Sequence, residues 1–158
     1  MARTGALRRL KDKVASSLSR RRTTTGVTGS GDTGGIAVSY APRRNGRADP
    51  GEVAWTWVAY EDDPSQGKDR PVLVLGWDGP MLVAVPLSSK DHADRRDAHE
   101  WVDVGRGGWD PQRRVSYADA SRLLRVDAGA VRREGASLDV RAFERVVARV
   151  AQLHGWTR

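Results

Sequence analysis

The chain has 158 residues and no cysteine. Disulfide bonds and thiolate metal sites are therefore excluded, and a reducing, cytoplasmic compartment is the expected location. Long apolar stretches are missing as well, because no run approaches the roughly 20 residues that a membrane-spanning helix needs. No secretory signal is predicted either, since no apolar stretch follows the basic N-terminus. The sequence therefore predicts a protein with no membrane partner.

Acidic residues are scarce only toward the N-terminus. The net charge is +7, but residues 1–48 carry 11 Lys/Arg against 2 Asp/Glu, whereas residues 49–158 carry 16 against 18. A strongly basic balance is typical of proteins that bind nucleic acid. Here that balance belongs to the N-terminal segment, and the rest of the chain is mildly acidic. Any nucleic-acid binding by residues 49–158 must therefore depend on a local cluster of basic side chains.

The basic N-terminal part divides into two predicted segments. Residues 1–22 are predicted to form a basic amphipathic helix or tail, because apolar residues recur there at spacings of three and four. Either it is a solvated tail, or it is a helix that docks on nucleic acid or an anionic surface. Residues 23–48 are rich in Gly, Ser and Thr and are predicted to be a flexible linker, whose end near Tyr40 begins to touch the domain. The apolar residues of the helical pattern are Leu7, Leu10, Val14 and Leu18.

Residues 49–158 carry the patterns of a β-rich domain. Apolar and polar positions alternate over 52–60, which predicts a strand, and 61–70 is predicted to be a polar loop. The apolar run 71–75 predicts a strand buried on both faces. It should form a hairpin with 81–87 across the turn at 77–80. Shorter strands are predicted at 99–104, 113–118, 121–126 and 130–133.

A helix is predicted at the C-terminal end. One face of it should consist of Phe143, Val146, Val147, Val150 and His154, which recur at helical spacing. Ser137 or Asp139 can cap its N-terminus, and Gly155 should end it. Five or six short strands with one closing helix predict a mainly β fold, a small closed or half-closed barrel.

Three sequence blocks make the chain resemble a known family. They are Gly51-Glu52-Val53-Ala54-Trp55, then the stretch Gln66-Gly67-Lys68-Asp69-Arg70-Pro71 with its apolar continuation to Leu75, then Val85-Pro86-Leu87-Ser88-Ser89. The order is a Gly-acidic-apolar-apolar-Trp strand, a loop ending in Arg-Pro before an apolar strand, and a strand ending in a hydroxyl residue. In this order they resemble the MazF/PemK toxins of type II toxin–antitoxin systems.

The resemblance implies an SH3-like β-barrel with a C-terminal helix, the fold shared by MazF and CcdB, assembled as a homodimer. It implies cleavage of single-stranded RNA, with no metal and no cofactor. It also implies an antitoxin protein that neutralises the domain by occupying the RNA groove. By this resemblance the barrel domain spans residues 49–158, and the preceding 48 residues lie outside the family's core pattern.

The resemblance also implies two catalytic residues. The family's functional arginine corresponds to Arg70, and its functional threonine corresponds to Ser88, with Ser89 as the one-residue alternative. RNA cleavage without a metal uses the 2′-hydroxyl as nucleophile, so charge on the phosphate must be stabilised. The guanidinium fork of Arg70 suits that task, and a neighbouring hydroxyl can donate to a phosphate oxygen or orient the arginine.

Four further residues are candidates for RNA binding, and three of them have a structural alternative. Lys68 and Lys90 flank the proposed site and can hold phosphates, or they can be solvated lysines. Ser89 can donate to RNA. Alternatively, Ser88 and Ser89 are simply turn residues that end a strand. His92 can bind RNA and assist proton transfer. The corresponding alternative for Arg70 is a surface pair with Asp69 or Glu61.

The tryptophans and the C-terminus leave rival interpretations open. Trp55 and Trp101 are expected in the core, and Trp57 in the core or a dimer interface, although bases also stack on such rings. One rival function is a non-catalytic SH3-like module that binds nucleic acid or protein. The other is a CcdB-like gyrase poison, because such toxins depend on a C-terminal tryptophan and this chain carries Trp156.

Overall fold

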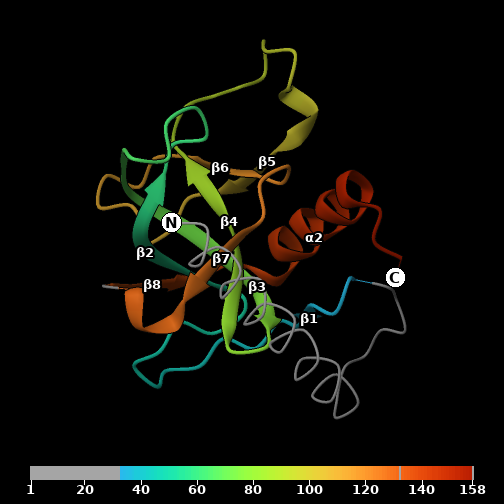
Figure 1. Cartoon of the computed structure of the whole chain (residues 1–158). Coiled ribbons are helices and arrows are strands. Elements are labelled where there is room, and N and C mark those ends of the chain that lie inside the picture. The colour runs from blue at the N-terminus through green and yellow to red at the C-terminus, as the bar shows by residue number, and fades with distance from the viewer. Residues whose placement is uncertain (1–32, 132, 158) are drawn as a thin grey trace.

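The computed structural model describes residues 33–131 and 133–157. Within these ranges the chain forms one antiparallel sheet of eight strands and one long helix, α2 (Figure 1). The mainly β fold with a C-terminal helix is confirmed, whereas the basic helix expected in 1–22 lies outside the described residues. The strands are β1 (Ala37–Val38), β2 (Glu52–Ala59), β3 (Gly67–Asp78), β4 (Met81–Ser88), β5 (Trp101–Gly105), β6 (Ser116–Asp119), β7 (Leu124–Asp127) and β8 (Arg133–Ser137), with short 3₁₀ turns η1 (Ala98–Glu100) and η2 (Ala128–Ala130), and α2 spans Val140–His154.

The sheet is organised around the β3–β4 hairpin. The strand order is β5-β6-β4-β3-β2-β8, with β1 also paired to β3 and β7 also paired to β4. Asp78 lies opposite Met81, so the hairpin predicted at this turn is confirmed. Register shifts between Val74 and Gly76 and between Asp103 and Gly105 add local twist. Because β3 and β4 each bind two different strands along their outer edges, the sheet curls into a half-barrel.

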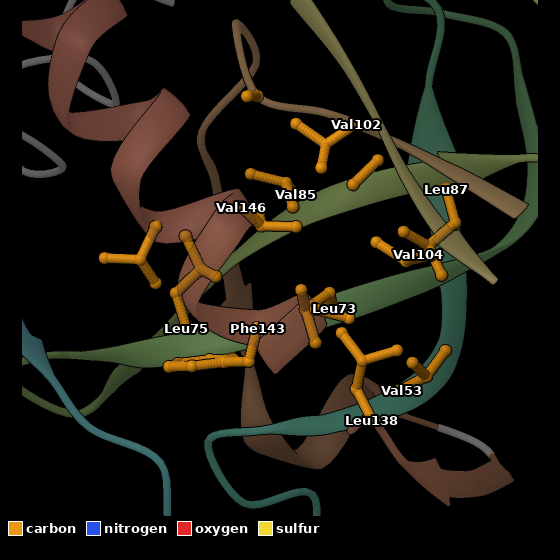
Figure 2. Packing of buried hydrophobic residues seen from close by; sticks show 14 of the residues in the cluster. Val53, Leu73, Leu75, Val85, Leu87, Val102, Val104, Leu138, Phe143 and Val146 are labelled. Atoms are coloured by element: carbon orange, nitrogen blue, oxygen red, sulfur yellow. The ribbon is translucent and has the colours of Figure 1, made fainter. Parts of the chain in front are cut away.

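The core lies between the concave face of this sheet and α2. Figure 2 shows Phe143 and Val146 of the helix packed toward Leu73, Leu75 and Val85 of the sheet. All five are buried, and full burial of one such side chain contributes about 1.5–3 kcal/mol. The helical face predicted from the spacing is therefore confirmed from Phe143 to Val150, whereas His154 at its end is exposed. The strand predicted to be buried on both faces is confirmed as well, because the residues that alternate with Leu73 and Leu75 are buried too, namely Val72 and Val74.

Both ends of α2 are capped by the residues that the sequence suggests. The carboxylate of Asp139 accepts a hydrogen bond from the backbone N–H of Arg141, so Asp139 rather than Ser137 is the N-cap. Gly155 ends the helix in the left-handed conformation, with φ of 70°, and its N–H donates to the carbonyl of Ala151.

Ordered structure begins earlier than the predicted domain boundary at residue 49. β1 pairs with β3, where Ala37 lies opposite Trp77. This close approach requires Gly76, because a Cβ there would collide with the backbone of Ala37. Ile36 is buried beside β1, and the hydroxyl of Tyr40 donates to the carbonyl of Leu138. The described part of the predicted linker 23–48 therefore contains a strand, and the side chain of Ile36 beside it is buried.

Strand β3 also begins earlier than predicted. The segment 67–70 was expected to belong to a polar loop, but Gly67 pairs with Ala59 and Arg70 pairs with Thr56. The backbone ladder with β2 holds this part of the strand. Because its side chains are polar, it has no apolar pattern by which the strand could have been predicted. The other strands lie within a few residues of their predicted positions.

Candidate functional site

The open end of the β3–β4 hairpin, away from its turn, is hollowed into a cleft of about 400 Å³. In Figure 1 this is the upper end of the sheet, where the arrowheads of β2 and β4 lie below the loop that leads to β5. All six residues selected from the sequence line this one cleft: Lys68, Arg70, Ser88, Ser89, Lys90 and His92. The remaining walls are formed by Trp55, Asp69, Pro71, Leu87, Arg95, Trp101, Trp109, Asp110, Arg114 and Ser116.

The cleft opens where β3 and β4 separate. The two strands are paired from their turn as far as Val72 opposite Pro86. Beyond that point Arg70 belongs to the ladder with β2, and Ser88 belongs to the ladder with β6. Pro71 and Pro86 stand at the fork and have no N–H to offer a ladder. If the hairpin register is carried two residues outward, Arg70 falls across from Ser88 on the facing strand.

Three cationic side chains crowd together at this fork. The pKa of Lys68 is lowered from its ordinary value, first by the positive charge of Arg70, then by burial and by Lys90. A local cluster of basic residues is what RNA binding by a mildly acidic domain requires. The predicted alternative pair of Arg70 with Glu61 is not formed, because Glu61 pairs with Arg122 at 3.3 Å.

Ser88 forms part of a turn at the end of β4. Its Oγ accepts a hydrogen bond of 3.1 Å from the backbone N–H of Lys90. The turn role expected as the structural alternative is therefore present. It also fixes the hydroxyl group at the cleft wall and leaves its own hydrogen to donate to a ligand. Ser89 is exposed and lines the same cleft.

His92 is the least exposed of the six selected residues, at 6%. Its ring stacks on the indole of Trp101, with centroids 3.7 Å apart and planes within 4°. Nη1 of Arg95 faces Nδ1 at 3.5 Å. Since a guanidinium only donates, Nδ1 is the acceptor, and the proton of the neutral ring sits on Nε2. Nε2 is buried and has no hydrogen-bond partner among the described residues.

The tryptophans are distributed differently from the prediction. Trp55 and Trp101, expected in the core, are half-buried and line the cleft instead. Trp57 is 51% exposed, so it is not a core residue. Trp109 is the buried one, and its Nε1–H donates to Ser116 at 2.9 Å. Val53, Trp55 and Trp57 lie on one face of β2. On this face the core ends at Val53, and Trp55 beyond it lines the cleft.

Sequence reasoning missed one charged pair in the cleft, Asp110 and Arg114. Nε of Arg114 donates to Oδ2 of Asp110 at 2.8 Å. The carboxylate is buried, and this hydrogen bond is the first cause that lowers the pKa of Asp110. The only sequence signal for this contact is that Arg114 follows Asp110 by four residues, after the turn-forming pair Asp110-Pro111.

A second hollow lies between β5 and α2, but its arginines already have structural partners. Arg145 donates to the carbonyl of Asp103 at 3.2 Å, and Arg149 donates to the carbonyl of His99. Across the described ranges, no three His, Asp or Glu side chains gather as metal ligands would. No helix in the same ranges is long and apolar enough to cross a membrane.

Comparison with known families shows to which family the chain belongs. Residues 49–154 match the family of PemK-like, MazF-like toxins of type II toxin–antitoxin systems. The chain belongs to this family. No curated protein matches the sequence.

Solved structures agree on the fold at low sequence identity. MazF from Deinococcus radiodurans is 18% identical, with a TM-score of 0.54, over 70% of this chain and 99% of the other. A mycobacterial endoribonuclease in complex with its cognate antitoxin is 16% identical, with a TM-score of 0.52, over 68% and 95%. A MazE–MazF complex from Deinococcus radiodurans is 16% identical, with a TM-score of 0.52, over 70% and 98%.

The MazF-like region does not contain the whole sheet. The family match begins at residue 49, whereas β1 lies at Ala37–Val38. β1 is therefore an addition to the matched region that packs on β3 at the turn end of the hairpin, far along β3 from Arg70.

Proposed function

We propose that this chain is the toxin of a type II toxin–antitoxin pair and acts in the cytoplasm as an endoribonuclease on single-stranded RNA. The observation that carries the proposal is the convergence of all six sequence-selected residues on one cleft. Two strands and a loop supply them, so their meeting does not follow from adjacency in the sequence. The cleft also presents Trp55 and Trp101, on which unpaired bases can stack.

The proposed reaction needs only groups of the chain and of the RNA. The 2′-hydroxyl gives up its proton as its oxygen attacks the neighbouring phosphorus. The bond from phosphorus to the 5′-oxygen breaks and that oxygen takes up a proton, so the products are a 2′,3′-cyclic phosphate and a 5′-hydroxyl. Negative charge builds on the phosphate oxygens during the attack. Arg70 would stabilise that charge through two parallel N–H donors, and the hydroxyl of Ser88 would supply another. Lys68, Ser89 and Lys90 would bind phosphates along the strand.

Partners follow from the same proposal. An antitoxin protein would occupy the cleft and block RNA, and two copies of the chain would form a homodimer. Light scattering should then report about twice the mass of one chain at micromolar concentration. A monomer would count against a homodimer and leave the cleft of each copy to act alone.

The direct test incubates a long synthetic RNA with the wild-type protein in EDTA and analyses the products. Cleavage with 2′,3′-cyclic phosphate ends is expected. Arg70→Ala and Ser88→Ala should each slow cleavage by about 10²–10³-fold, as loss of one well-placed transition-state donor does. Arg70→Lys should restore little, because an ammonium cannot make the bidentate contact. Ser88→Thr keeps the hydroxyl and should stay active.

A matched control is available on the helix. Arg141 is exposed in the first turn of α2 and does not line the cleft. Arg141→Ala removes the same charge as Arg70→Ala and should leave cleavage unchanged. Wild-type protein that binds RNA of many sequences and cuts none would instead support the non-catalytic binding module.

The gyrase-poison alternative depends on the C-terminal tryptophan. Trp156 packs against the core, and its N–H donates to the carbonyl of Ala151. Apolar contact just after a glycine cap is a common way to end a helix. The position of Trp156 is thus explained by the fold, and a supercoiling assay should show no inhibition of gyrase.

A further inference from the structure

The loop between β5 and β6 forms the wall of the cleft on the β6 side of Ser88, and it is held rigidly. Trp109 anchors it: the indole is buried, its Nε1–H donates to Ser116, and its carbonyl accepts from Nε1 of Trp55 at 3.0 Å. Gly107 permits this arrangement, because a Cβ there would collide with the ring of Trp109. The residues that follow Trp109 therefore start from a fixed point.

The next residue, Asp110, organises the rest of the loop around its carboxylate. It accepts hydrogen bonds from the backbone N–H of Gln112 at 2.9 Å and of Arg114 at 3.3 Å. Its own carbonyl accepts from the N–H of Arg113 at 2.9 Å. Arg113 has φ of 50°, a left-handed conformation that costs a non-glycine residue about 1–2 kcal/mol. The chain holds this conformation, which turns the following residue toward the carboxylate.

Arg114 is thereby oriented at the cleft. The carboxylate of Asp110 is 7% exposed and engages Nε, while the side chain of Arg114 is 54% exposed. The contact at Nε leaves the terminal Nη groups as donors for a second anion. Salt bridges between two exposed side chains contribute little to stability. This pair differs from them, because its carboxylate is buried and holds one end of an exposed guanidinium. Such an arrangement suits a guanidinium that must be held in place before a ligand arrives.

The strand register places Arg114 relative to the proposed catalytic pair. Tyr117 lies opposite Ser88 in the antiparallel ladder of β4 and β6. Residues that precede β6 therefore lie outward of Ser88, on the side where the chain continues to Lys90. Arg114 and Lys90 both line the cleft there. An RNA phosphate bound between Arg70 and Ser88 would leave room for its neighbour beside Arg114.

We propose that Arg114, positioned by Asp110, binds a phosphate next to the scissile one and so holds the RNA strand in register. This inference rests on the proposed function and assigns a second phosphate position within the same cleft. Arg114 contributes equally to the bound RNA and to the transition state, whereas Arg70 acts mainly on the transition state. Loss of Arg114 should therefore raise KM and leave kcat nearly unchanged.

The experiment measures cleavage of an RNA oligonucleotide and, separately, binding of its 2′-O-methyl analogue, which cannot be cut. Arg114→Ala should raise KM and the Kd for the analogue about tenfold, as loss of one charge-assisted contact does. The slope of log K for analogue binding against log salt concentration should become less steep by about 0.7, the value expected for loss of one phosphate contact with a single strand. Arg141→Ala is the matched control, because it removes the same charge from an exposed arginine that neither lines the cleft nor belongs to this loop.

Asp110→Asn tests the positioning role. The amide oxygen can still accept from the backbone, but it no longer holds the guanidinium by charge. KM should rise in the same direction, and the double variant should be no worse than Arg114→Ala alone. Equal salt slopes for Arg114→Ala and Arg141→Ala would overturn the proposal, as would a fall in kcat with KM unchanged. Absence of cleavage by the wild type would instead defeat the proposed function, and the analogue would still report on Arg114.

Discussion

At the scale of single residues, the cleft brings together groups that are unfavourable beside one another without a ligand. Lys68 lies close enough to Arg70 and Lys90 for their charges to lower its pKa. His92 has a buried Nε2 with no hydrogen-bond partner among the residues described. Unpaired buried donors and crowded like charges both cost free energy. A bound phosphate would supply the missing negative charge beside Lys68, Arg70 and Lys90.

The tautomer of His92 leads to a prediction about its role. Nε2–H is present in the neutral ring and in the imidazolium, so the group is a donor whether or not the ring is charged. Donation, rather than the proton transfer suggested by the sequence, is the role that this environment favours. His92→Gln keeps a donor near Nε2 and should retain most activity. His92→Ala, which removes the donor, and His92→Asn, which moves it to the Nδ1 position, should lose about ten- to hundredfold.

The measurement is the rate of RNA cleavage between pH 5.5 and 8 for the three variants. Proton transfer by His92 would make His92→Gln as slow as His92→Ala and would remove one limb of the wild-type pH profile. Thermal unfolding of each variant serves as the control, because all three lose the stacking of His92 on Trp101. A large fall in melting temperature that tracks the loss of activity would assign His92 a structural role.

At the scale of elements, the sequence predicts best where burial decides the structure. The hairpin of β3 and β4 follows from its apolar runs, and α2 follows from its apolar spacing and its caps. Prediction of secondary structure from apolar patterns fails for the strand residues that line the cleft. Residues 67–70 look like a loop because their side chains serve a polar cleft, although their backbone is part of a ladder with β2. Functional surfaces often break local patterns in this way.

The same reasoning explains what was found and missed within the cleft. Arg70 and Ser88 were found because family blocks mark them, and their strands carry them to one place. Arg114 was missed because its position depends on a loop whose shape is fixed by tertiary contacts, above all the burial of Trp109. β1 was missed because two residues carry no periodic pattern, and its contact with Gly76 joins distant parts of the chain.

The loop between β5 and β6 also predicts how stability depends on pH. The pKa of Asp110 lies below its ordinary value of 3.8, first because of the hydrogen bond from Arg114. A carboxylate with a lowered native pKa stabilises the fold above the pKa of the unfolded chain. That stabilisation is lost as pH falls below about 4 toward the native pKa. Asp110→Asn should therefore be less stable than the wild type at pH 7, and the gap should narrow toward pH 3.

Urea unfolding at pH 7, 5, 4 and 3 checks this expectation. Asp127 supplies a matched comparison, because its carboxylate also accepts from a backbone N–H, that of Gly129, but the residue is exposed. Asp127→Asn should change the stability at pH 7 less than Asp110→Asn does. A constant difference between Asp110→Asn and the wild type over this range would show that the charge of Asp110 does not stabilise the fold.

At the scale of the whole molecule, charge and fold divide the chain at different points. The family match begins at residue 49, but within the described part of the chain burial begins at Ile36 and strand pairing begins at Ala37. Residues 1–32 carry eight Lys/Arg and two Asp/Glu, so most of the excess positive charge lies before the described structure. A basic segment attached to a domain with its own cationic cleft can add phosphate contacts without altering the cleft.

Two truncations separate these contributions. A chain that begins at Thr33 loses a net charge of +6 and keeps the pairing of β1 with β3. It should unfold at nearly the wild-type temperature and cut saturating RNA at the wild-type rate, because the cleft residues all lie between Trp55 and Ser116. Its binding to the 2′-O-methyl analogue should weaken at low salt, with a flatter salt slope, since fewer counterions are released.

A chain that begins at Asp49 removes structure as well as charge. It loses the buried side chain of Ile36, the pairing of β1 with β3, and the contacts of Tyr40 with Leu138 and with the ring of Phe143. Its melting temperature should therefore fall clearly below that of the chain beginning at Thr33, because loss of one large buried side chain alone costs about 2–5 kcal/mol. Equal melting temperatures would mean that β1 contributes nothing to stability. An unchanged salt slope after removal of residues 1–32 would mean that the basic segment makes no contact with RNA, and that the cationic cleft alone accounts for binding.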